Sequence, residues 1–169
     1  SVVDTKCASM GEGLLVHYAL NNRDAGMDLA ANTAWLEENK GKLCHWFTVY
    51  DLNHLRRGGR VSAAAAFLGT MLSIKPVLHV DDEGRLIAME KAKGRARSIR
   101  ALFDHMKATA IKPEEQTVFI SHGDSESDAR QLADLIRTQL GVKDIRMNYI
   151  GPVIGTHSGP DTIALFFMG

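Results

Sequence analysis

The chain has 169 residues, 20 of them basic and 20 acidic, and 45% of its residues are hydrophobic. Balanced charge gives no overall field that would draw the protein to nucleic acid or to an anionic membrane. No apolar run approaches the roughly 18 to 20 residues that a membrane span needs, so we expect a globular chain without a transmembrane helix.

Cysteine and histidine usage argues against a disulfide framework and against a metal site. Cys7 and Cys44 are too few to staple a fold, and they indicate a reducing, cytoplasmic compartment, since no secretory signal opens the chain. The histidines at positions 17, 45, 54, 79 and 105 show no zinc-ligand spacing. We therefore expect neither a metal nor a cofactor.

Residues 1–41 are predicted to be the end of a first α/β domain. Residues 1–4 (SVVD) are typical of the end of a buried strand. Residues 8–25 and 28–39 favour helices, and Asp28 is a good N-cap for the second one. Because nothing precedes the strand to complete its sheet, we expect the chain to begin inside a domain.

Residues 42–169 are predicted to form a second domain, a mixed β-sheet covered by helices. Strands are expected at 43–51, 74–80, 85–92, 117–121, 143–150 and 162–167. Helices are expected at 52–57, at 95–110, and from Asp124 or Ser125 to about Leu140, where Gly141 ends the last one. Between them, Ser62 can cap a helix over AAAAFLGTML, which is apolar on every side and should be buried.

The segment RRGGR, residues 56–60, is a candidate anion site. Gly58 and Gly59 let backbone N–H groups approach a ligand, and Arg60 stands just before the predicted N-cap at Ser62. A carboxylate or phosphate there would meet a guanidinium and helix N–H groups together. The plainer alternative is a tight turn whose arginines point to water.

The segment GPVIGTHSGP, residues 151–160, is a second candidate. Its glycines and prolines predict a stiff Gly-rich loop or a short helix that presents Thr156, His157 and Ser158. His157 is able to donate a hydrogen bond to an anion or to carry a proton. The alternative is a structural loop with an ordinary hydrogen-bonded histidine.

Two further segments have simpler interpretations. In SHGDS, residues 121–125, a helix cap by Asp124 or Ser125 is favoured over a metal-binding or ligand-lining role for His122 and Asp124. The basic run EKAKGRARSIR, residues 90–100, is typical of a solvated helix face, with docking of an acidic protein as the alternative. No nucleophile elbow, Walker A sequence or kinase signature occurs.

Three stretches, HWFTVYDLNHLRRGGRVS, TMLSIKPVLHVDDEGRL and IGPVIGTHSGPDTIALFF, resemble the DegV family of fatty-acid-binding proteins. The opening VVDTKCASMGEG also resembles the strand-to-helix stretch of that family, with Thr5 in place of the usual serine. The loop has Ser158 where threonine is frequent and Asp161 where glycine is. The resemblance runs in family order from residue 1 to residue 169, and family members are longer by most of a first domain that also holds the carboxylate.

The resemblance implies a two-domain lipid-binding protein rather than an enzyme. A long-chain fatty acid such as palmitate, stearate or oleate would lie between the domains, with its carboxylate at the mouth and its acyl chain in an apolar tunnel. The loaded protein would present the acid to the catalytic subunit of a separate fatty acid kinase, whose acyl-phosphate serves phospholipid synthesis.

The family motifs also imply the site residues. Arg60 matches the arginine of the GGR motif and His157 the histidine of the loop, both at the head-group end. The other ligand-binding residues assigned on this basis are Gly59, Thr156, Ser158, Ser9, Phe67, Met71, Ile154 and Phe166. Leu72 and Phe103 are further candidates for the tunnel wall.

Two other hypotheses remain open. An enzyme acting on a small phosphorylated or carboxylated substrate would use Arg60 to hold the anion and His157 as acid or base. A fragment without its partner domain would bind nothing.

Overall fold

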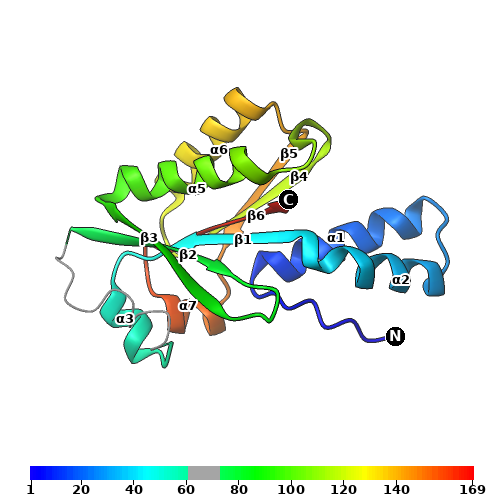
Figure 1. Ribbon diagram of the computed structural model, residues 1–169, viewed down its shortest axis with the longest axis horizontal. Coiled ribbons are helices and arrows are strands. Elements are labelled where there is room, and N and C mark those ends of the chain that lie inside the picture. The colour runs from blue at the N-terminus through cyan, green and yellow to red at the C-terminus, as the bar shows by residue number, and fades with distance from the viewer. Residues whose placement is uncertain (61–72) are drawn as a thin grey trace.

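The structure, a computed structural model, describes residues 1–60 and 73–169 (Figure 1). Its helices are α1 (Met10–Asp24), α2 (Leu29–Asn39), α3 (Leu52–Arg57), α5 (Arg95–Thr109), α6 (Glu126–Leu140) and α7 (Pro152–Ser158), with 3-10 turns η1 (Lys40–Lys42) and η2 (Pro113–Glu115). Its strands are β1 (Leu43–Thr48), β2 (Ile74–Val80), β3 (Leu86–Lys93), β4 (Thr117–His122), β5 (Asp144–Tyr149) and β6 (Ile163–Met168). The helix predicted over residues 63–72, with Ser62 as its cap, lies outside the described residues.

Within the described residues, one mixed sheet of six strands has the order β3-β2-β1-β6-β4-β5. Strands β4 and β5 run parallel, and every other neighbouring pair runs antiparallel. Figure 1 shows α5 and α6 on one side of the sheet and α3 and α7 on the other. The predicted fold, a mixed sheet covered by helices, is confirmed.

Alternation along the strands separates two cores on the two faces of the sheet. On β6, Leu165 and Phe167 belong to the core that α5 and α6 cover, whereas Ala164 and Phe166 belong to a second core with Leu14 of α1. Helix α1 is thus docked on the face opposite α5 and α6. The division of the chain into 1–41 and 42–169 remains a prediction.

The strand predicted at residues 1–4 is wrong, because these residues adopt no regular structure. A strand forms only where a neighbouring strand supplies hydrogen-bond partners, and no described strand pairs with these residues.

The strand predicted over 43–51 ends early, at Thr48. Asp51 instead caps α3, since its carboxylate accepts a hydrogen bond from the backbone N–H of Asn53 at 2.8 Å. None of the described helices combines the length and the apolar character required to cross a bilayer.

Candidate functional site

A cavity of about 260 Å³ lies on the sheet face opposite α5 and α6. Its sheet wall follows from alternation, because His45 and Phe47 of β1 share a face with Ala164 and Phe166 of β6 and with Ser121 of β4. The strand register sets Phe47 opposite Ala164, and Ala164 opposite Ser121. The small Ala164 side chain leaves room between two phenylalanines.

Helix ends and a hairpin form the rest of the cavity wall. Ala8 and Ser9 precede α1, Leu55 lies on α3, and Ile154 lies on α7. Three residues of the β2–β3 hairpin, Val80, Gly84 and Leu86, also line the cavity. The cavity is therefore lined mainly by apolar side chains, with polar groups at a few places, as is usual for sites that bind small molecules.

A close approach of α3 and α7 brings Arg60 and His157 together. A Cβ atom at Gly58 would lie 2.8 Å from the carbonyl oxygen of His157, so only glycine fits there. The Nδ1–H of His157 donates to the carbonyl of Gly58 at 2.7 Å, and the Arg60 guanidinium donates to the same oxygen at 3.2 Å. One carbonyl oxygen has two lone pairs and can accept from both.

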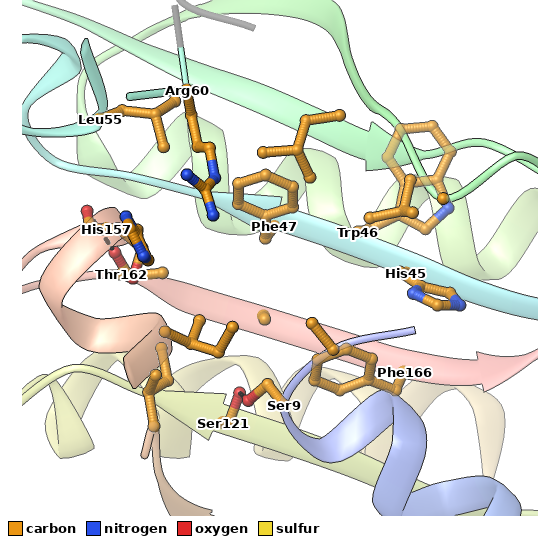
Figure 2. A pocket seen from close by; sticks show the side chains of 18 residues that line it. Ser9, His45, Trp46, Phe47, Leu55, Arg60, Ser121, His157, Thr162 and Phe166 are labelled. Carbon is orange, nitrogen blue, oxygen red and sulfur yellow. Dashed lines mark hydrogen bonds between the residues drawn. The ribbon is translucent and has the colours of Figure 1, made fainter. Parts of the chain in front are cut away.

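Figure 2 shows the Arg60 side chain extending into the cavity, with the His157 ring at the same end. Arg60 is largely exposed and His157 is half-buried. A second hydrogen bond also joins α3 to α7, because the Nε2–H of His54 donates to the carbonyl of Thr156 at 2.9 Å. The cationic turn and the histidine segment thus converge at one open end of an apolar cavity.

Most of the predicted site residues lie at this cavity. Its lining includes Arg60, His157, Ser158, Ser9, Ile154 and Phe166. Gly59 and Thr156 are absent from the lining. Gly59 provides a turn at φ 81°, and the Thr156 hydroxyl donates to the carbonyl of Pro152 within α7.

The remaining predicted wall residues divide into two groups. Phe67, Met71 and Leu72 lie outside the described residues. Phe103, a candidate whose orientation the sequence left open, is fully buried in the core that α5 and α6 form on the other face of the sheet and does not face the cavity.

Sequence reasoning missed Ser121, His45 and Thr162, which all line the cavity. Side chains of a strand point alternately to its two faces, so Phe119 and Ser121 lie on the same face of β4. A polar residue on a buried strand is unusual, and this could have marked Ser121 as a site residue. Thr162 uses its hydroxyl to donate to the carbonyls of Ser158 and Gly159 at 3.0 and 2.9 Å, which fixes the end of α7.

Burial keeps His45, which lines the cavity, and the neighbouring Cys7 uncharged. The Cys7 thiol lies 3.0 Å from Nε2 of His45. Burial raises the pKa of Cys7 to about 12, and burial followed by the nearby His79 lowers the pKa of His45 to about 4. Both groups are neutral near pH 7, which suits an apolar ligand rather than an ion at this place.

The predicted cap in SHGDS is wrong, because neither Asp124 nor Ser125 caps α6 with its side chain. The N-cap residue Ser125 makes no side-chain cap hydrogen bond. Its N–H instead donates to Nδ1 of His122 at 3.2 Å, and its hydroxyl donates to Asp128 at 3.1 Å. The described residues hold no group of ligands that could bind a metal ion.

The basic run at 90–100 is only partly a solvated face. Arg95 forms a half-buried ion pair with Asp128 at 2.6 Å, whereas Arg100 pairs with Asp104 on the surface at 2.9 Å. Docking of an acidic protein at this run stays a prediction.

Comparisons with known proteins agree with the geometry. The family model described as "Uncharacterised protein, DegV family" matches residues 1–169. A DegV domain-containing protein of Clostridium perfringens is 50% identical over 168 residues, which is 99% of this chain and 58% of the relative. The chain therefore spans less than two thirds of the length of that relative.

Two solved structures share the fold. A DegV family protein from Thermus thermophilus, described for its fatty acid binding, has a TM-score of 0.89 at 32% identity, over 100% of this chain and 61% of that one. The Fatty Acid Kinase (Fak) B3 protein of Streptococcus pneumoniae, loaded with linoleic acid, has a TM-score of 0.89 at 19% identity, over 99% and 59%. The second likeness concerns the fold alone.

Proposed function

This chain belongs to the DegV family, and on that premise we propose that it binds a long-chain fatty acid such as palmitate, stearate or oleate in the cavity below α3 and α7. The carboxylate lies at the open end, near Arg60 and His157, and the acyl chain follows the apolar wall toward Phe166. The cavity is lined from both parts into which we divide the chain, since Ala8 and Ser9 precede residue 42 and the other lining residues follow it.

The observation that carries the proposal is the pairing of unlike groups in one cavity. A guanidinium and an imidazole stand at one end, while mainly aromatic and aliphatic side chains line the rest. A fatty acid has the same two unlike parts, a carboxylate and a hydrocarbon chain. The fatty acid binding described for the Thermus thermophilus protein supports the same ligand class.

The binding free energies expected for the acyl chain and for the carboxylate indicate different roles for the two ends of the cavity. Burying ~14 methylenes contributes on the order of 11 kcal/mol at ~0.8 kcal/mol each. One charge-assisted hydrogen bond adds about 1.5 to 3 kcal/mol, and association costs roughly 4 to 15 kcal/mol. The acyl chain therefore dominates affinity, and Arg60 and His157 mainly orient the carboxylate.

We further propose that the loaded protein acts in the cytoplasm as a carrier, not an enzyme, and presents the carboxylate to the catalytic subunit of a fatty acid kinase. Exposure of Arg60 leaves the head-group end accessible to such a partner. The fold shared with the Streptococcus pneumoniae Fatty Acid Kinase (Fak) B3 protein is consistent with this role. The acyl-phosphate product would enter phospholipid synthesis.

The test measures whether the purified protein retains a fatty acid and whether that acid is phosphorylated. Full-length protein purified from bacteria should release a long-chain acid under denaturing mass spectrometry. In Arg60→Gln and His157→Gln, affinity should fall roughly 10- to 100-fold, as the loss of one charge-assisted hydrogen bond implies. Acyl-phosphate formation with ATP and the host kinase subunit should still fall about 100-fold when the variants are saturated with acid, because a misplaced carboxylate is poorly aligned for transfer. Arg137→Gln, on the exposed side of α6, is the control and should change neither quantity.

A lipid-free protein that ignores added fatty acids would contradict the proposal. Turnover of a small anionic substrate that His157→Ala abolishes, with no acid bound, would support the enzyme alternative instead.

A further inference from the structure

A pair of hydroxyl groups in the cavity wall has an unused proton. The hydroxyl oxygens of Ser9 and Ser121 lie 3.0 Å apart, and neither hydroxyl has another partner among the described residues. Each serine has one donor proton, so one hydrogen bond between them consumes one of two. The second proton has no acceptor in the part of the chain that the structure describes.

The surroundings make this spare proton unusual. Ser121 is fully buried and lies beside Ala164 in the β4–β6 register, and Phe166 lines the same wall. A buried donor without a partner is unfavourable, and most buried polar groups in proteins are satisfied. A polar atom of a ligand in the cavity would satisfy it.

Ser9 has no structural role that explains its hydroxyl. It stands at the N-cap of α1, where serine ordinarily bonds to a backbone N–H, yet it makes no side-chain cap hydrogen bond. Its backbone is held at φ 56° and ψ −137°, in a region that favours glycine. The strained conformation directs the hydroxyl to Ser121 instead of to the helix.

The serine pair is separate from the carboxylate end. Figure 2 shows Ser9 and Ser121 beside Phe166, on the opposite side of the cavity from Arg60 and His157. An acyl chain whose carboxylate lies at Arg60 would therefore meet the serines along its length and not at its carboxylate. The cavity thus offers two polar positions to one elongated ligand.

We propose that the Ser9–Ser121 pair is a subsite for an oxygen substituent along the acyl chain, so that the protein binds hydroxylated long-chain fatty acids. The hydroxyl of the ligand accepts the spare serine proton and donates its own to a serine oxygen. This inference rests on the proposed fatty acid binding and names the class of acid that the cavity favours.

The experiment compares acids that differ by one oxygen. Full-length, delipidated protein is titrated with stearic acid and with a set of monohydroxystearic acids that carry the hydroxyl at different positions. One isomer should bind at least as tightly as stearic acid, and isomers with a misplaced hydroxyl should bind about tenfold more weakly, because they bury an unsatisfied group.

Serine variants then locate the effect. Ser121→Ala and Ser9→Gly should lower affinity for the favoured isomer about fivefold more than they lower affinity for stearic acid, which has no oxygen along its chain. Glycine at position 9 suits the φ of 56°, so this variant should fold even if Ser121→Ala does not. Ser127→Ala, exposed on α6, is the matched control.

Two results would overturn the inference while leaving fatty acid binding intact: stearic acid binding more tightly than every isomer, or serine variants that change affinity for both acids equally. Failure of the wild-type protein to bind stearic acid at all would overturn the proposed function, and the subsite with it.

Discussion

His45 links the cavity to the pH dependence of stability. Its pKa is lowered to about 4 in the folded protein by burial and by the neighbouring His79, against 6.5 as the ordinary value. The unfolded chain therefore binds a proton that the folded chain does not between these pH values. The contribution of His45 to the free energy of unfolding is therefore fully present above about pH 6.5. It falls by about 2 to 3 kcal/mol as the pH drops toward 4.

This prediction is checked by urea unfolding of the wild type and of His45→Gln at pH 7.5, 5.5 and 4.5. The wild type should lose about 2 kcal/mol more than the variant over this range, because glutamine does not titrate. Parallel pH profiles for the two proteins would show that His45 is not the group responsible.

Gly58 is the residue at which the head-group end depends on backbone contact. A methyl group there would lie 2.9 Å from Cα of His157, and a helix backbone cannot yield as a flexible side chain can. Gly58→Ala should therefore destabilise the fold by about 1 to 3 kcal/mol and weaken fatty acid binding, since it separates Arg60 from His157.

Thermal unfolding and a fatty acid titration measure both effects. Gly41→Ala is the control, because a Cβ at Gly41 meets nothing within 4 Å. A Gly58→Ala protein as stable as the control would mean that α3 and α7 are not held at this contact.

At the scale of elements, α2 depends on its cap more than on burial. None of its residues is fully buried, and Asp28 accepts from the N–H of Ala31 at 2.8 Å. Asp28→Ala should destabilise α2 by about 1 kcal/mol, which amide hydrogen exchange would report as roughly fivefold faster opening of α2 relative to α6.

The control for this cap is Asp24→Ala, which removes only an exposed ion pair with Arg23 and should change exchange little. Equal exchange in α2 with and without the Asp28 carboxylate would refute the role of the cap.

The boundaries of helices and strands were predicted correctly where they depend only on neighbouring residues. Asp28 at the start of α2 and Gly141, at φ 61° after α6, act as predicted, because a cap needs only its own backbone neighbours. The strand at residues 1–4 was wrong because a strand needs partners distant in sequence. The side-chain cap of α6 was wrong although its partners are local, because neighbouring side chains take the hydrogen bonds of Ser125. His122 accepts from the N–H of Ser125, and the Ser125 hydroxyl donates to Asp128 instead of accepting from an N–H in the first turn of α6.

At the scale of the molecule, the site is assembled from distant segments. Gly58 and His157 are 99 positions apart, and Ser9 and Ser121 are 112 apart, yet both pairs are in hydrogen-bond contact. Antiparallel pairing of β6 with both β1 and β4 places these segments around one sheet face. A pattern of neighbouring residues in the sequence does not predict which strands pair.

The sequence by itself determined the kinds of element and two of the polar motifs, since periodicity, caps and glycine turns act over a few neighbouring residues. Its family motifs also placed Arg60 and His157 at a common end. Only the tertiary structure decided that Ser121 and His45 face the same cavity, that Phe103 does not, and that Thr156 stays outside. Strand order and register choose the face on which each side chain is buried, and those depend on contacts made by the whole chain at once.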